Sequence, residues 1–172
     1  MRNQILARWN SLDPATAARE ALPCCGSQAW AAALASRRPI VDEASLIETS
    51  SSIWLALPEE AWQEAFDSHP RIGQSHAQTD ATEESLRWSA QEQHTAFSDN
   101  ETARLALEQA THRYEQKFGG IFIVCATGKT AAEILAILEA RMKNDTATEL
   151  REAVEQQSQI TQLRLHRWLE SE

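Results

Sequence analysis

Apolar residues recur every three or four positions through most of the chain, which is the spacing of one face of an α-helix. The clearest stripe is formed by Ala103, Leu107, Ala110, Tyr114 and Phe118. A Gly-Gly pair follows it directly and is typical of a helix end. Two further stripes consist of Ile134, Leu135, Leu138 and Met142, and, less regularly, of Val154, Ile160, Leu163, Trp168 and Leu169. The pattern predicts three helices in the second half of the chain.

A Ser/Thr-x-x-Glu pattern stands before each of these three segments, at Ser98–Glu101, Thr130–Glu133 and Thr146–Glu149. In a capping box the hydroxyl accepts a hydrogen bond from the third helical N–H, and the glutamate accepts one from the N-cap N–H. We therefore expect the three helices to begin at these positions.

The first half of the chain carries proline and acidic signals for four more helices. Asp13 before Pro14 is typical of an N-cap with proline in the first turn, and Pro39 ends a second helical pattern. Pro58 and two acidic residues open another helix, which ends because Pro70 disfavours helical angles at His69. The predicted ranges are about 14–22, 28–38, 42–57 and 58–69.

The segments near 69–82 and 119–129 lack a helical pattern. Within the second, Ile121 to Ala126 is expected to be extended, but the chain has no partner strands with which it could form a sheet. No linker is long enough to divide the chain. The sequence therefore predicts an all-α fold, a single compact domain over residues 1–172 with roughly seven to nine helices.

Composition narrows the classes of function. The 172 residues carry a formal net charge of −9, and an acidic chain without a basic stripe is a poor partner for nucleic acid and for anionic membranes. No apolar run approaches the roughly 18 residues of a membrane-spanning helix, and the first ten residues lack a secretory apolar core. Three cysteines, two of them adjacent, indicate reduced thiols, so we expect a cytoplasmic protein.

No recognisable motif for a metal or a cofactor is present. The chain has no CxxC, HExxH, GxGxxG, phosphate-binding loop or GxSxG pattern. We therefore predict neither a metal site nor a cofactor, and the candidate chemistry lies with isolated polar residues.

His69 is the first candidate, because a proline fixes the backbone directly after it and a helix end favours its protonated form. The alternative is a histidine that only stops the helix. Glu92 is the second candidate: with Ser89 it has the spacing of a capping box, but beside Gln93 it forms a polar pair suited to a ligand. Arg164 lies among apolar neighbours. Its guanidinium either extends to water or binds a ligand through two parallel hydrogen bonds.

Seven blocks of sequence carry a resemblance to a known family. They are CCGSQAWA (24–31), RP (38–39), EAFDSHPRIG (64–73), SAQEQ (89–93), YEQKFGGIFIVCATGK (114–129), RMKND (141–145) and ITQLRL (160–165). In this order and across nearly the whole chain, they resemble the OHCU decarboxylase family of urate breakdown. Gly120 departs from the Phe that is usual in this family, and we expect it to loosen the pocket wall; Thr111 departs from the common Asn.

The resemblance implies a cofactor-free decarboxylase that converts 2-oxo-4-hydroxy-4-carboxy-5-ureidoimidazoline to (S)-allantoin and carbon dioxide. It also implies an all-helical homodimer whose catalytic pair falls on His69 and Glu92. The ligand contacts it implies are Pro70, Ser89, Ala90, Gln91, Glu92, Gln93, the backbone of Phe122, Ile123, Val124, Cys125 and Ala126, and Arg164.

Two other hypotheses stay open on the sequence. The chain could be a helical interaction module without catalysis, in which His69 and Glu92 only cap helices and the six tryptophans serve packing and a partner groove. It could also be a hydrolase of a related ureide. The sequence does not show which of the two residues delivers the final proton.

Overall fold

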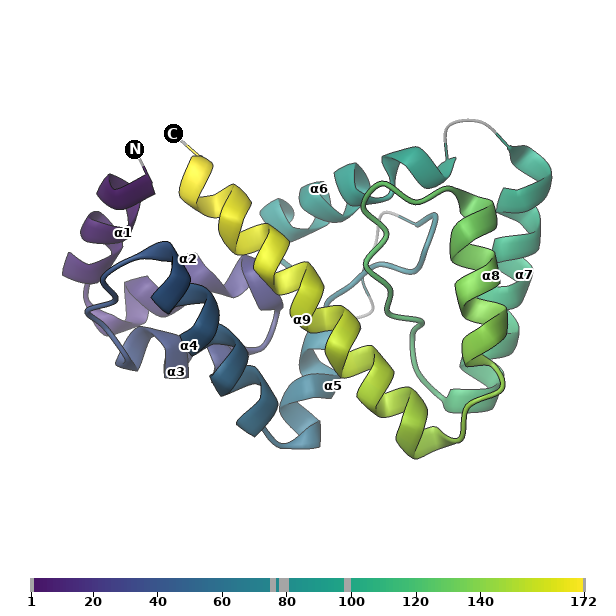
Figure 1. Cartoon of the computed structure of the whole chain (residues 1–172), viewed down its shortest axis with the longest axis horizontal. Coiled ribbons are helices and arrows are strands. Elements are labelled where there is room, and N and C mark those ends of the chain that lie inside the picture. The colour runs from purple at the N-terminus through teal and green to yellow at the C-terminus, as the bar shows by residue number, and fades with distance from the viewer. Residues whose placement is uncertain (1, 75–76, 78–80, 98–99, 172) are drawn as a thin grey trace. The chain divides into compact units, whose positions relative to one another are not determined.

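The computed structural model describes residues 2–74, 77, 81–97 and 100–171, and these residues form helices and irregular segments but no β-strand (Figure 1). The all-α prediction is confirmed. The elements are α1 (Arg2–Ser11), α2 (Pro14–Cys25), α3 (Gln28–Ser36), α4 (Glu43–Ala56), α5 (Glu59–Asp67), α6 (Glu83–Glu92), the 3-10 turn η1 (His94–Phe97), α7 (Glu101–Phe118), α8 (Ala131–Arg141) and α9 (Thr146–Glu170). None of these helices is long and apolar enough to cross a membrane.

The chain divides into two compact units. Unit 1 comprises residues 1–65 and 158–172, and unit 2 comprises residues 66–157. Helix α9 contributes its first twelve residues, 146–157, to unit 2 and the rest to unit 1. Each unit is described by itself below.

Unit 1 is built around buried tryptophans. Trp9, Trp30 and Trp54 are at most 2% exposed, and Trp9 meets the ring of Trp168 edge-on at 5.7 Å. Burying an indole requires a partner for its N–H. Trp9 donates to the carbonyl of Ala17 at 2.9 Å, and Trp30 donates to a backbone carbonyl of α4 at 3.3 Å. These tryptophans therefore fix the packing of α1 to α4 without an unsatisfied polar group.

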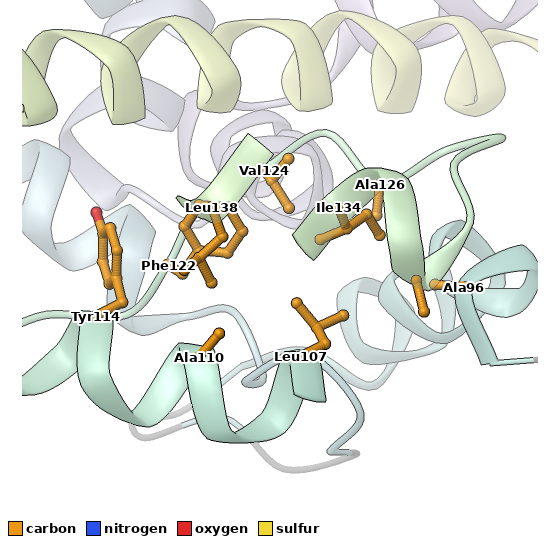
Figure 2. Close-up of a cluster of buried hydrophobic side chains, with 10 residues drawn as sticks. Ala96, Leu107, Ala110, Tyr114, Phe122, Val124, Ala126, Ile134 and Leu138 are labelled. Atoms are coloured by element: carbon orange, nitrogen blue, oxygen red, sulfur yellow. The ribbon is translucent and has the colours of Figure 1, made fainter. Parts of the chain in front are cut away.

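Unit 2 has its own apolar core between α7, α8 and the segment that joins them (Figure 2). Leu107, Ile134 and Leu138 are at most 1% exposed, and each such burial stabilises the fold by about 1.5–3 kcal/mol. Tyr114 packs against Phe122 with ring centroids 5.1 Å apart. Because α7 and α8 pack side by side in Figure 1, the apolar stripes predicted for them face a common core.

Of the three helix starts that were predicted in the second half of the chain, one is confirmed and two are corrected. Thr130 and Glu133 form the capping box in full. Helix α9 is capped one residue earlier than predicted, because the carboxylate of Asp145 accepts the N–H of Thr148 at 2.7 Å. Helix α7 is capped by Asn100, whose side chain accepts the N–H of Ala103. The predicted cap at Ser98 lies outside the described residues.

In the first half, the four predicted helices are present, with first residues that differ by at most one position and last residues that differ by one to three. Asp13 caps α2 as predicted, and Gly26 ends it with φ +88°. Helices α1 and α6 were not predicted. The apolar stripe of the last helix was partly wrong, because Leu163 is 39% exposed.

Candidate functional site

His69 lies just after α5, in the irregular segment of unit 2 that was expected to leave the helix. Its backbone N–H donates to the carbonyl of Phe66 at 3.1 Å, and its side chain is only 8% exposed. Nε2 of the ring lies 2.7 Å from Oε1 of Gln157 on α9. The ring therefore does not face water. The catalytic role of His69 stays a prediction.

Glu92 is the last residue of α6 rather than the third residue of a helix. Helix α6 begins at Glu83, and its N-cap is Thr82, which accepts the N–H of Ser85. The interpretation of Ser89 and Glu92 as a capping box is therefore wrong. A carboxylate at a helix C-terminus opposes the helix dipole, and Glu92 is nevertheless 9% exposed. The helix dipole therefore does not account for a buried carboxylate at this position, and the catalytic role of Glu92 stays a prediction.

The SAQEQ block presents alternate faces of the end of α6. Ser89, Glu92 and Gln93 are buried, whereas Ala90 and Gln91 are exposed. Spacings of three and four residues put the three buried side chains on one helix face. Five ligand contacts were predicted in this block. The three of them that are buried are all polar and lie on this one face.

A hydrogen bond between a backbone N–H and a side-chain amide joins this end of α6 to the HPRIG block. The N–H of Gly73 donates to Oε1 of Gln93 at 3.0 Å, and Gly73 has φ +84°, a conformation that favours glycine. Because the oxygen of the Gln93 amide accepts this bond, its NH₂ group is the remaining donor. No hydrogen-bond partner of that NH₂ lies among the described residues. The blocks that carry His69 and Glu92 are thus tied together.

A cavity of about 560 Å³ lies beside this junction in unit 2. Two of the predicted ligand contacts, Ala90 and Gln93, line it, whereas His69 and Glu92 are not among its lining residues. The lining residues are Ile72, Gly73, Gln74, Leu86, Ala90, Gln93, His94, Phe97, Arg104, Leu107 and Glu108. Its volume suits a small molecule.

The segment from Phe122 to Ala126 has no regular secondary structure and is buried throughout. The sequence predicted an extended segment without partner strands over Ile121 to Ala126. The side chains of Phe122, Val124 and Ala126 enter the core of unit 2, as Figure 2 shows. Alternate side chains on one face are the period of an extended chain. Ile123 and Cys125, which alternate with these residues, are also buried but do not belong to this core cluster.

The two peptide units on either side of Val124 each form a hydrogen bond to a side chain at one of their two polar groups. Nη1 of Arg141 donates to the carbonyl of Ile123 at 2.6 Å, and Oε1 of Gln156 accepts the N–H of Cys125 at 2.8 Å. A trans peptide is planar, so its N–H and C=O point in opposite directions. The opposite ends of these two units are the N–H and the C=O of Val124, and neither has a hydrogen-bond partner among the described residues. One residue thus offers a donor and an acceptor to a ligand.

A buried ion pair underlies this arrangement. Arg141 and Glu149 are 5% and 3% exposed, and Nη2 and Nε of the arginine lie 2.5 Å and 2.9 Å from Oε1 of the glutamate. The hydroxyl of Tyr114 donates to the same oxygen at 2.5 Å, and burial raises the pKa of this tyrosine above its ordinary value. The guanidinium also lies 4.6 Å from the ring centroid of Phe122. The contacts with Glu149 and Phe122 therefore fix the guanidinium of Arg141 in the position from which it binds the carbonyl of Ile123.

Arg164 belongs to unit 1, where it is 1% exposed. Nη1 donates to the carbonyl of Pro23 at 3.2 Å, near the C-terminal end of α2, where the helix dipole favours a cation. The interpretation that this arginine extends to water is wrong. Nearby Cys25 is also buried, and burial raises the pKa of its thiol to about 12. The role of Arg164 as a ligand contact stays a prediction.

Sequence reasoning missed the residues that hold the site from outside the motifs. Arg141 was noticed only as part of RMKND, and Gln156 and Gln157 were not considered. Gln157 carried a usable signal, because it is a polar residue three positions from both Val154 and Ile160 in an otherwise apolar stripe. Within the residues that the structure describes, no group of three or more His, Cys, Asp or Glu side chains could hold a metal ion.

Comparison with known proteins gives the same answer by sequence and by structure. A sequence profile of the OHCU decarboxylase family matches residues 10–166. The uric acid degradation bifunctional protein TTL of Arabidopsis thaliana is 36% identical over 144 residues, which are 83% of this chain. The 2-oxo-4-hydroxy-4-carboxy-5-ureidoimidazoline decarboxylase of Amia calva is 29% identical over 136 residues, 78% of this chain and 77% of that protein.

A crystal structure of OHCU decarboxylase in the presence of (S)-allantoin superposes with a TM-score of 0.74 at 33% identity, covering 87% of this chain and 96% of that one. The chain spans only 44% of the length of the Arabidopsis relative, which is named as a bifunctional protein.

Proposed function

Because this chain belongs to the OHCU decarboxylase family, we propose that it converts 2-oxo-4-hydroxy-4-carboxy-5-ureidoimidazoline to (S)-allantoin and carbon dioxide without a cofactor. The observation that carries the proposal is the hydrogen bond from Gly73 to Gln93, which ties the His69 block to the Glu92 block. Two buried titratable residues that are far apart in sequence thereby belong to segments that a hydrogen bond joins, which supports their assignment as an acid–base pair.

The substrate supplies its own electron sink, which is why the proposal needs no cofactor. The carboxylate leaves from a ring carbon that also bears a hydroxyl and adjoins a ring C=N bond. When the bond to carbon dioxide breaks, its electron pair forms a carbon–carbon double bond, and the imine pair moves to nitrogen. The nitrogen takes up one proton and becomes N–H. The hydroxyl then loses its proton to become the carbonyl, and the former imine carbon gains a proton. The protein has to orient the ring and deliver that proton to one face.

We assign the catalytic roles to His69 and Glu92. An imidazole next to the substrate hydroxyl accepts or donates a proton near neutral pH. The carboxylate of Glu92 accepts hydrogen bonds from ring or ureido N–H groups, and Ser89 and Gln93 share its face of α6. The predicted contacts at Pro70, Ala90, Gln91 and Arg164 belong to the same proposal. Of these groups, those in unit 2 would hold the substrate while the electron pair moves.

The backbone of 122–126 is proposed to recognise the flat heterocycle. The N–H and C=O of Val124 match the alternating C=O and N–H groups of a ureide. Held peptide groups recognise such an edge without losing side-chain entropy on binding. The segment therefore contributes orientation, while His69 and Glu92 contribute proton transfer.

One coupled assay tests the function. The urate oxidation product is generated, the hydrolase of the preceding step is added, and the appearance of optically active allantoin is followed by circular dichroism with and without this protein. The expected result is that (S)-allantoin forms faster than in the spontaneous reaction and that His69→Asn lowers kcat by about 10²–10⁴-fold with the helical spectrum unchanged. Spontaneous-rate, racemic product in the presence of folded protein would exclude a decarboxylase and favour an interaction module, and a different ring-opened product would favour a ureide hydrolase.

We further propose a cytoplasmic homodimer. Three described cysteines are unbridged and buried, which suits a reducing compartment. The dimer is an expectation from the resemblance. Light scattering of the purified protein should give twice the chain mass of 19.3 kDa.

A further inference from the structure

Gln157 makes a contact with the catalytic candidate that no local helix geometry requires. It is 0% exposed on the part of α9 that belongs to unit 2, and its Oε1 lies 2.7 Å from Nε2 of His69, a residue 88 positions away in the sequence. Burying a primary amide is costly unless it is hydrogen-bonded. A glutamine at this place therefore indicates a specific partner rather than general packing.

The chemistry of the two side chains sets the direction of the bond. An amide oxygen accepts hydrogen bonds and does not donate them, so the contact requires a proton on Nε2 of His69. When the ring is neutral, its lone pair then resides on Nδ1. The hydrogen bond also fixes the rotation of the ring about its two side-chain torsions, as the orienting partner does in other catalytic histidines.

We propose that Gln157 is a positioning residue that holds His69 in the Nε2–H tautomer, so that Nδ1 is the nitrogen that exchanges a proton with the substrate. The catalytic part of this inference rests on the proposed function. The tautomer part stands on the contact between the two side chains alone.

The ¹⁵N spectrum of histidine-labelled protein tests the tautomer directly, because protonated and unprotonated ring nitrogens resonate far apart. The signal of His69 is assigned by its loss in His69→Asn. At a pH at which the ring is neutral, we expect Nε2 to carry the proton and Nδ1 to be unprotonated. Gln157→Glu keeps an accepting oxygen and should retain this spectrum, whereas Gln157→Leu should shift it toward a mixture of tautomers. A wild-type spectrum with the proton on Nδ1 would overturn the inference, even if a variant fails to fold.

Turnover tests the positioning role. A neutral hydrogen bond lost by Gln157→Leu should lower kcat by about tenfold with little change in KM, and Gln157→Glu should restore most of it. Gln159→Leu is the matched control, because it makes the same change at an exposed site on the same helix and should leave kcat unaltered. A changed tautomer with unchanged kcat would overturn the catalytic part alone. Full activity of His69→Asn would refute the assignment of His69 under the proposed function and leave the tautomer result standing.

Discussion

Replacing Arg141 by methionine should be among the most destabilising single changes in unit 2. Methionine keeps much of the side-chain length but removes the guanidinium. The carboxylate of Glu149 then stays buried with only neutral donors, the hydroxyl of Tyr114 and the amide of Asn144, among its remaining described contacts. The carbonyl of Ile123 also loses the donor that lies at 2.6 Å.

The magnitude follows from the burial of both charges. Removing one partner of a buried ion pair costs about 3–5 kcal/mol, because the other charge is left without compensation. For a chain of this size about 1 kcal/mol lowers Tm by about 2–4 °C, so the expected drop is roughly 6–20 °C. Combining Arg141→Met with Glu149→Gln removes both charges, and the double variant should be more stable than Arg141→Met alone.

Urea denaturation followed by circular dichroism measures these values, provided that fluorescence gives the same transition. Arg113→Met, at an exposed position of α7, is the control and should change the free energy of unfolding by less than about 0.5 kcal/mol. A cost below about 1 kcal/mol for Arg141→Met, or a double variant whose cost is the sum of the single ones, would refute the reasoning.

Three further predictions concern the other buried groups. Glu92→Gln should lower kcat by about 10²–10⁴-fold with near-normal melting, since the carboxylate opposes the dipole at its helix end; normal activity with a lowered Tm would return Glu92 to a structural role. Arg164→Lys should weaken allantoin binding about ten- to a hundredfold in a titration of folded protein, and Arg167→Lys should not; equal effects would remove Arg164 from the site. Burial raises the pKa of Cys25 from 9.0 to about 12, so the folded chain keeps a proton that the unfolded chain loses above about pH 9. The free energy of unfolding should therefore fall as pH rises from about 9 to 12, by up to about 1.4 kcal/mol per pH unit, and Cys25→Ala should flatten that slope in urea titrations; an unchanged slope would contradict the shift.

Local signals explain which helices could be predicted from the sequence. Caps and apolar stripes act within one or two turns, so Asp13, Thr130 and the stripe of α7 predicted their helices. Helix α6 was missed because the Ser89–Glu92 spacing imitates a helix start inside a helix. Its true start had a signal, since Thr82 precedes two acidic residues in the first turn.

The site was predictable only as far as it is local or shared with a family. His69 was identifiable from the proline behind it, and the extended segment from its lack of periodicity. The contacts of Gln157 with His69 and of Gln156 with Cys125 join residues 88 and 31 positions apart. A local pattern can single out one residue of such a pair, as it does for His69 and Gln157, but it does not say which distant residue that one contacts. Only the folded backbone shows that the two meet.

The peptide groups of Val124 have a genetic consequence. Every amino acid except proline supplies the same N–H and C=O, so codon changes at position 124 alter the bulk beside the core but scarcely touch the donor and acceptor themselves. Mutation can instead change how this donor and acceptor are oriented through Arg141 and Gln156, whose side chains bind the peptide units on either side of Val124. Under the proposed contact of Val124 with a ligand, changes in ligand recognition should therefore be recorded at Arg141 and Gln156 as well as at the residues proposed to touch the ligand.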